Sequence, residues 1–255
     1  MPDRDLEPTI PDPKKLRRTA LILVGIMIVG GIVILKAYEK RTQEGENDKR
    51  PSFVTQISDQ KDLTFIRQDG KISELKALKG KVIVVQGMPR SEPDEITVGV
   101  MKRLSEKYAG RKDFTLVTLV LDPGAADGLQ EELQGVVEIT GAALPQWIIA
   151  SNERPTLHRF IKNEFKATML PYESDGKWNY DRSLVLIDRN RHVRRAVVPQ
   201  KRGGAAHVAA FDFEQAQEWD KQGLKTGVDR SNVDQMEVLL NETIEILLNE
   251  TESHD

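Results

Sequence analysis

The run "TALILVGIMIVGGIVIL", from Thr19 to Leu35, holds 17 residues without a charge. A helix rises about 1.5 Å per residue, so this run, extended by Ala37 and Tyr38, nearly spans a hydrocarbon core of about 30 Å. Core helices of small domains are rarely apolar on every face. A cleaved signal peptide is the alternative, but the run is long for one and no A-x-A-like site follows it. We therefore expect one uncleaved transmembrane helix over residues 19–38.

The flanking charges indicate an orientation. Basic residues crowd the N-terminal side of the run, and a single one touches its other end: Lys14, Lys15, Arg17, Arg18 and then Lys36. Over a wider window this bias disappears, because Arg4 joins the first group and Lys40, Arg41, Lys49 and Arg50 join the second. The immediate flank favours an N-terminus inside the cell. We expect an inner-membrane, single-pass protein with its globular domain on the periplasmic or outer face.

Composition divides the rest of the chain. Residues 1–18 are polar and proline-rich, which predicts a disordered cytoplasmic tail. Residues 39–52 form a charged linker whose lack of apolar side chains predicts a tether. Residues 53–250 should form the globular domain, and 251–255 a short tail. The net charge of −3 gives no case for nucleic-acid binding.

Apolar periodicity alternates between strand and helix along the domain. Continuous apolar runs predict strands buried on both faces, and residues spaced three and four apart predict helices. Strands are expected at 53–57, 63–75 (a pair with an Asp-Gly turn), 81–85, 113–123 and 146–151, with a hairpin over 183–198. Helices are expected at 94–110, 129–141, 156–165 and 232–250. This order predicts an α/β domain with a mixed sheet flanked by helices.

The stretch "MPRSEP", residues 88–93, joins a predicted strand to a predicted helix. Ser91 could cap that helix, and Pro93 would suit its first turn. The chain has no cysteine, which excludes disulfides, thiol catalysis and zinc–thiolate sites. Its four histidines are scattered without metal-ligand spacing, so we interpret them as solvated or capping residues. With no nucleophile elbow, Walker loop or dinucleotide fingerprint either, we predict no catalytic or cofactor-binding residues and no enzyme.

Two charge patterns stand out near the C-terminus. "RNRHVRR" is strongly basic, and Ser231 to Asp255 holds seven acidic residues and no Lys or Arg. One interpretation is a solvated hairpin and a solvated helix face. The other is a pair of complementary surfaces that steer a partner, or a hairpin that contacts lipid headgroups.

Four segments occur in an order typical of one protein family. They are "ALKGKVIVV", "LVTLVLDP", "QWIIASN" and "YDRSLVLIDRNRHVR". With the upstream apolar run, they resemble the Sco/SenC family of membrane-anchored, thioredoxin-fold copper proteins that assist cytochrome c oxidase assembly. The resemblance covers about residues 51–250 and implies a thioredoxin-like fold.

The family's copper site is a C-P-x-x-C-P loop plus the histidine of a D-H-S segment. On this chain the loop corresponds to M-P-R-S-E-P, with both prolines kept as Pro89 and Pro93. The three ligand positions correspond to Met88, Glu92 and Arg182, and all depart from the pattern. A thioether is a weak ligand, a carboxylate is hard and a guanidinium has no lone pair to give. We therefore expect no metal ligands. Glu92 and Arg182 are expected to approach each other, where they could form a two-pronged ion pair in place of the metal. The alternative is that each side chain points to solvent.

The resemblance implies a non-catalytic binding or assembly factor for respiratory-oxidase biogenesis that uses no cofactor. Its partners would be the bilayer, through the N-terminal helix, and oxidase subunits or assembly factors. The alternative is a chaperone that still carries copper through Met88 and other donors. A thiol peroxidase, which shares this fold, is excluded because it needs a cysteine.

Overall fold

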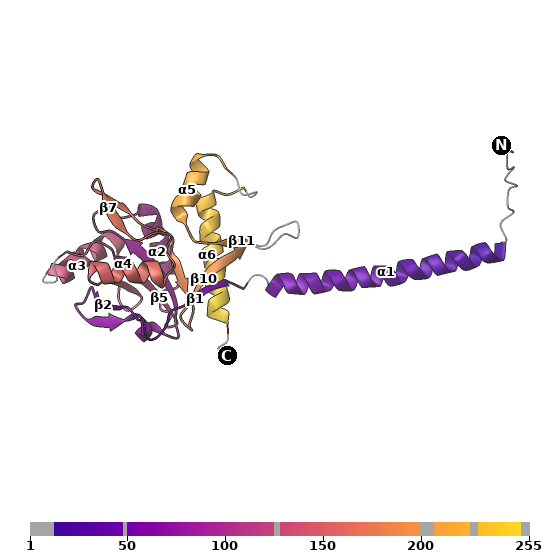
Figure 1. The fold of residues 1–255 in the computed structure, drawn as a ribbon, viewed down its shortest axis with the longest axis horizontal. Coiled ribbons are helices and arrows are strands. Elements are labelled where there is room, and N and C mark those ends of the chain that lie inside the picture. Colours follow the sequence, from indigo (N-terminus) through magenta and orange to yellow (C-terminus); the bar gives the residue numbers. More distant parts are fainter. Residues whose placement is uncertain (1–12, 48–49, 125–127, 199–206, 225–228, 251–255) are drawn as a thin grey trace, which may run out of the picture. The chain divides into compact units, whose positions relative to one another are not determined.

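The computed structural model describes residues 13–47, 50–124, 128–198, 207–224 and 229–250 (Figure 1). The chain divides into two compact units, Met1–Asp48 and Lys49–Asp255. The first contains helix α1 (Pro13–Asn47), whose part from Pro13 to Ala37 is long and apolar enough to cross a membrane. An N-terminal signal sequence passes the same test of length and composition.

Helix α1 is longer than the predicted membrane span. It starts at Pro13, inside the predicted tail, and continues through most of the predicted linker to Asn47. Residues 39–47 of the predicted linker are therefore helical. That stretch, "EKRTQEGEN", contains Glu, Lys, Arg and Gln, which are good helix formers and can continue a helix without any packing partner. Residues 1–12 and 251–255, predicted as tails, lie outside the described residues.

The second unit is built on a nine-stranded mixed sheet in the order β1-β10-β9-β4-β5-β6-β2-β3, with β11 paired to β10. Its strands are β1 (Ser52–Gln56), β2 (Thr64–Arg67), β3 (Ile72–Glu74), β4 (Val82–Met88), β5 (Phe114–Val120), β6 (Trp147–Ser151), β9 (Val185–Ile187), β10 (His192–Val198) and β11 (His207–Ala209). Strands β4, β5 and β6 are parallel, whereas β9 runs antiparallel to β4. A separate hairpin joins β7 (Tyr172–Ser174) to β8 (Lys177–Asn179).

Both faces of the central strands are buried. Val82, Val84 and Met88 of β4 belong to one core cluster, and the alternate residues Ile83 and Val85 belong to the other. The first cluster is covered by α2 (Glu95–Lys107), α3 (Leu129–Thr140), α5 (Phe213–Lys221) and α6 (Asn232–Asn249), and the second by α4 (Arg154–Asn163) and the 3-10 turn η1 (Leu75–Leu78). This burial explains why the strands read as continuous apolar runs.

The connections are those of a thioredoxin-like domain, which confirms the predicted fold class. Strand β4, helix α2 and parallel strand β5 form the first half, and the β9–β10 hairpin followed by α6 forms the second half on the other side of β4. Sequence analysis missed α5, β11 and the β7–β8 hairpin. That hairpin turns at Asp175 and Gly176, which both have positive φ (52° and 73°), as an Asp-Gly turn between two strands requires.

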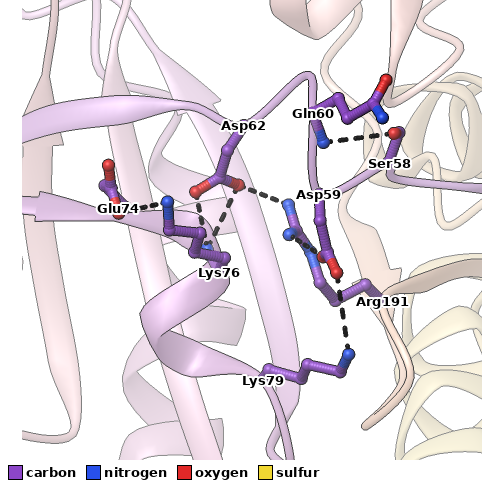
Figure 2. Close-up of polar contacts among 8 residues, drawn as sticks. All are labelled: Ser58, Asp59, Gln60, Asp62, Glu74, Lys76, Lys79 and Arg191. Atoms are coloured by element: carbon purple, nitrogen blue, oxygen red, sulfur yellow. Dashed lines mark hydrogen bonds and ion pairs between the residues drawn. The ribbon is translucent and has the colours of Figure 1, made fainter.

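The basic hairpin is not solvated, contrary to the first interpretation. Arg191 at its turn is 3% exposed and donates to Asp59 at 2.7 Å and to Asp62, which lie on the β1–β2 connection (Figure 2). Arg194 donates to Asp188 at 2.7 Å. Arg189 donates to the carbonyls of Leu248 (2.9 Å) and Glu250 (2.6 Å). These three arginines are engaged inside the domain, so they cannot form the proposed headgroup or partner surface.

The acidic residues of α6 also have partners inside the domain. Glu237 receives two hydrogen bonds from Arg103 of α2, at 2.7 and 2.6 Å, and Glu245 accepts one from the Tyr108 hydroxyl at 2.9 Å. Lys107 lies 3.5 Å from Glu245. The acidic face of α6 therefore complements the basic end of α2 and packs the two helices together, which a survey of charge along the chain does not reveal.

Candidate functional site

The candidate site begins at the carboxyl end of β4, where Met88 is the last strand residue. Its side chain is completely buried in the core cluster that contains Val98 and Met101 of α2. Its carbonyl accepts a hydrogen bond from the amide of Leu121 at 3.0 Å, which ties the end of β4 to the end of β5. Met88 is thus a core residue, and its thioether does not face solvent.

Asp122, two residues after the end of β5, shapes the loop that follows Met88. Its carboxylate is 7% exposed and accepts hydrogen bonds from the amides of Arg90 and Ser91, the latter at 3.1 Å, and from the Ser91 hydroxyl at 2.9 Å. The side chain of Arg90 lies 2.8 Å from Glu132 of α3. Hydrogen bonds to a carboxylate are stronger than those between neutral groups, so three of them can hold this loop in place without a metal.

Helix α2 is not capped as the sequence suggested. Asp94 is its N-cap and accepts hydrogen bonds from the Ile96 amide at 3.1 Å and from the Thr97 hydroxyl. Pro93 therefore lies before the helix, and Ser91 bonds to Asp122 rather than to the helix. Aspartate and serine are nearly equal as N-caps, so local sequence left the choice open. The hydrogen bonds from Ser91 to Asp122 take Ser91 away from the helix, so Asp94 becomes the N-cap.

Glu92 projects from this loop towards two other elements. One carboxylate oxygen accepts a hydrogen bond from the backbone amide of Trp178 in β8, at 3.1 Å. The other oxygen lies 3.7 Å from a terminal guanidinium nitrogen of Arg182. The loop after β4, the β7–β8 hairpin and the segment before β9 therefore meet at Glu92.

Arg182 is the second half of this junction. Its Nε lies 3.3 Å from a carboxylate oxygen of Glu214 in α5, and its guanidinium stacks 4.9 Å from the centre of the Tyr180 ring. The Arg182 side chain is 23% exposed, against 41% for Glu92 and 58% for Glu214. The predicted approach of Glu92 and Arg182 is confirmed. The two residues do not form the two-pronged pair that the sequence allowed, because Arg182 divides its charge between two carboxylates.

The residues on either side of Arg182 are held by the fold. Asp181 accepts hydrogen bonds from the amides of Thr168 (2.6 Å) and Ser183 (3.0 Å). Burial alone would raise the pKa of Asp181, but these hydrogen bonds outweigh it and lower the pKa below its ordinary value. Tyr180 is 6% exposed, and burial raises the pKa of its phenol. The D-R-S segment is thus positioned by backbone contacts, as a binding segment requires.

The residues present do not fit a copper ion. Copper in proteins prefers thiolate and imidazole ligands. Here the thioether of Met88 is sealed in the core, and the position matching the histidine carries the guanidinium of Arg182. Within the described ranges no group of three or more His, Cys, Asp or Glu side chains is arranged to hold a metal.

His158, expected to be solvated or capping, is instead buried. It is 6% exposed, and its Nε2 lies 2.7 Å from the carbonyl oxygen of Leu121. Burial lowers the pKa of His158, so the neutral imidazole is favoured. Its ring also packs edge-on against Trp178, with centroids 5.9 Å apart. His158 is therefore a core residue that packs beneath Trp178 and the end of β5.

Three contributors to the site escaped sequence analysis: Asp122, Trp178 and Glu214. Asp122 carried a readable signal, because the Asp-Pro at the end of a buried strand lies beside the end of the neighbouring parallel strand. Glu214 carried none, since it lies on the unpredicted helix α5 and 32 residues separate it from Arg182. Trp178 acts through its backbone amide, which no side-chain pattern can indicate.

No protein-family model and no curated protein matches the chain. Among solved structures it is similar to a SCO1/SenC family lipoprotein from Bacillus anthracis, at 24% identity over 52% of this chain and 80% of the other, with a TM-score of 0.46. It is also similar to BsSco, a member of the Sco family of cytochrome c oxidase assembly proteins, at 19% identity over 58% of this chain and 86% of the other, with a TM-score of 0.47. A third similar structure is copper-bound ScoI from Bradyrhizobium japonicum, at 15% identity over 71% of this chain and 96% of the other, with a TM-score of 0.43. At such identities and TM-scores no function is inherited, and a role has to come from the residues of this chain.

Proposed function

We propose that this chain is a Sco/SenC-like, membrane-anchored binding or assembly factor for respiratory-oxidase biogenesis that works without a copper site. The observation that carries the proposal is the ionic junction of Arg182 with Glu92 and Glu214, at 3.7 and 3.3 Å. It joins the M-P-R-S-E-P loop to the D-R-S segment, the two segments that the family links through copper. The loop is therefore held in place by ordinary interactions.

A recognition role follows from what the site contains. Without a thiol it can neither exchange disulfides nor form thiolate bonds to a metal. What remains is an ordered surface, with the loop held by Asp122 and with partly exposed charges on Glu92, Arg182 and Glu214. Such a surface offers shape and charge to another protein.

The N-terminal helix supplies the location in this proposal. As an uncleaved anchor it would keep the domain next to membrane-embedded oxidase subunits. The basic residues before the span favour a domain outside the cytoplasm.

A reporter that is active only in the periplasm, fused after Asp255, should be active. An inactive periplasmic fusion together with an active cytoplasmic one would reverse this orientation.

Deletion of the gene in its native host tests the assembly role. We expect cytochrome c oxidase activity to fall and to return with the wild-type gene, but not with added copper, because the proposed factor delivers none. Unchanged oxidase activity in the deletion strain would refute the role. Recovery with copper alone would instead favour the copper-carrying alternative through Met88.

A further inference from the structure

A small cavity lies against the sheet, beside the segment that carries Arg182. Its volume is about 40 Å³, several times the ~10–15 Å³ that one water molecule needs. Its apolar wall comes from the central strands and from the end of α4: Val85, Leu119, Leu121, Ile161 and Phe165. The cavity therefore suits a small apolar group, and a large aromatic ring would not fit.

Two cationic side chains line this cavity without an anionic partner. Neither Lys166 nor Arg195 makes an ion pair or a side-chain hydrogen bond within the part of the chain that the structure describes. The neighbouring Arg194 differs, because it is paired with Asp188 at 2.7 Å. Asp181 also lines the cavity as an anion, and its two oxygens accept hydrogen bonds from the amides of Thr168 and Ser183. Lys166 and Arg195 therefore leave one positive charge in excess beside the apolar wall.

A buried hydroxyl provides a second, independent observation. Tyr180 lines the same cavity, is 6% exposed, and its phenol oxygen has no hydrogen-bond partner among the described residues. Buried polar groups in native proteins are nearly always hydrogen-bonded, so an orphaned one calls for a ligand or an ordered water. A phenol can donate to a carboxylate or to a peptide carbonyl.

The chain beside the cavity presents apolar side chains to solvent. Met169, Leu170 and Tyr172 are 40%, 47% and 53% exposed. The start of their loop is held by Lys162 of α4, which donates hydrogen bonds to the carbonyls of Ala167 and Thr168 at 2.9 and 2.7 Å. These three side chains provide exposed apolar surface that a partner could cover.

We propose that this cavity binds the C-terminal residue of a partner polypeptide, with a small apolar side chain inside and the terminal carboxylate at Lys166 and Arg195. The preceding residues of the partner would lie along Met169, Leu170 and Tyr172. The positive charge in excess of Asp181 and the unpartnered Tyr180 hydroxyl select this occupant, because an apolar group alone would satisfy neither of them. The cavity adjoins the Glu92–Arg182 junction through Tyr180, which lines the cavity and packs against Arg182, but the proposal does not depend on the oxidase role.

The test is fluorescence anisotropy on the full chain in detergent micelles. The probe is the pentapeptide Gly-Ser-Gly-Ala-Val with an N-terminal fluorophore and a free C-terminal carboxylate. We expect saturable binding, weakened about tenfold or more when the terminus is amidated, which corresponds to about 1.4 kcal/mol. The same peptide ending in tryptophan should bind more weakly than the valine peptide, because the cavity is too small for the ring.

Matched variants locate the binding. Lys166→Gln and Arg195→Gln should each weaken binding of the peptide with a free carboxylate and leave binding of the amidated peptide unchanged. Ala167→Leu, which narrows the cavity, should weaken both peptides. Lys71→Gln is the control, since its side chain is 77% exposed and does not line the cavity. Absence of saturable binding, equal binding of acid and amide, or equal effects of Lys166→Gln and Lys71→Gln would each overturn the proposal. The deletion test of the oxidase role would stand in any of these cases.

Discussion

The Glu92–Arg182 contact allows a quantitative test of how the site is held. At 3.7 Å, the attraction between two unit charges is about 1 kcal/mol in water and about 4.5 kcal/mol at an effective dielectric of 20. Glu92 is 41% exposed and Arg182 is 23% exposed, so screening and side-chain ordering remove most of the larger figure. Arg182 also divides its charge with Glu214 at 3.3 Å. We expect a coupling free energy of about 0.3–1 kcal/mol.

A double-mutant cycle on the second unit alone, residues Lys49–Asp255, measures this coupling from urea unfolding curves. Glu92→Gln removes the charge but keeps an oxygen that can accept from the Trp178 amide. Arg182→Met removes the guanidinium but keeps apolar contact with Tyr180. The coupling should shrink as salt is added, because partly exposed charges are screened.

Two results would contradict this account. A coupling indistinguishable from zero at low salt would mean that the two side chains do not meet. A coupling of about 3 kcal/mol or more that is insensitive to salt would mean a desolvated pair. Glu214→Gln serves as a second arm: with Arg182→Met it should give a coupling under about 1 kcal/mol, because Glu214 is the more exposed partner at 58%.

Three further outcomes are expected in urea unfolding. Asp122→Asn should lower the free energy of unfolding by about 1–3 kcal/mol, because a buried acceptor of three hydrogen bonds is weakened; a change near zero would show that Asp122 does not hold the loop. Asp62→Asn should cost about 1.5–3 kcal/mol, because the Asp62 side chain is only 9% exposed and its hydrogen bond is to a buried charged group, whereas the same change at Asp59, which is 65% exposed, should cost under about 1 kcal/mol; equal costs would contradict the assigned burial. Hydrogen bonding by Arg111 lowers the pKa of Asp113 to about 2. Its stabilising contribution is therefore present above the unfolded-state pKa near 4 and lost as the pH falls from about 4 to 2, so Asp113→Asn should flatten the stability profile in that window, and an unchanged profile would argue against the shift.

Short-range patterns were sufficient for the frame of the protein. The strands β4 and β5 were predictable because a strand buried on both faces needs an unbroken apolar run. The apolar part of α1 was predictable because membrane thickness sets a minimum length. Order of elements then predicted a mixed sheet flanked by helices, since parallel neighbours need crossover helices, and the resemblance to a known family implied the thioredoxin-like arrangement.

Long-range contacts decided the roles of individual charged and polar residues. Met88 is sealed in the core because α2 packs over it, and His158 is buried because it meets a carbonyl at the end of β5. Arg191 looked solvated in a basic run, yet Asp59 and Asp62 draw it inside. A charged side chain is exposed or buried according to whether a partner from elsewhere offsets its desolvation, and local sequence carries no record of that partner. The sequence by itself therefore determined the central strands, the membrane-type helix and the place of the loop at residues 88–93, while only the tertiary structure decided which charges meet there.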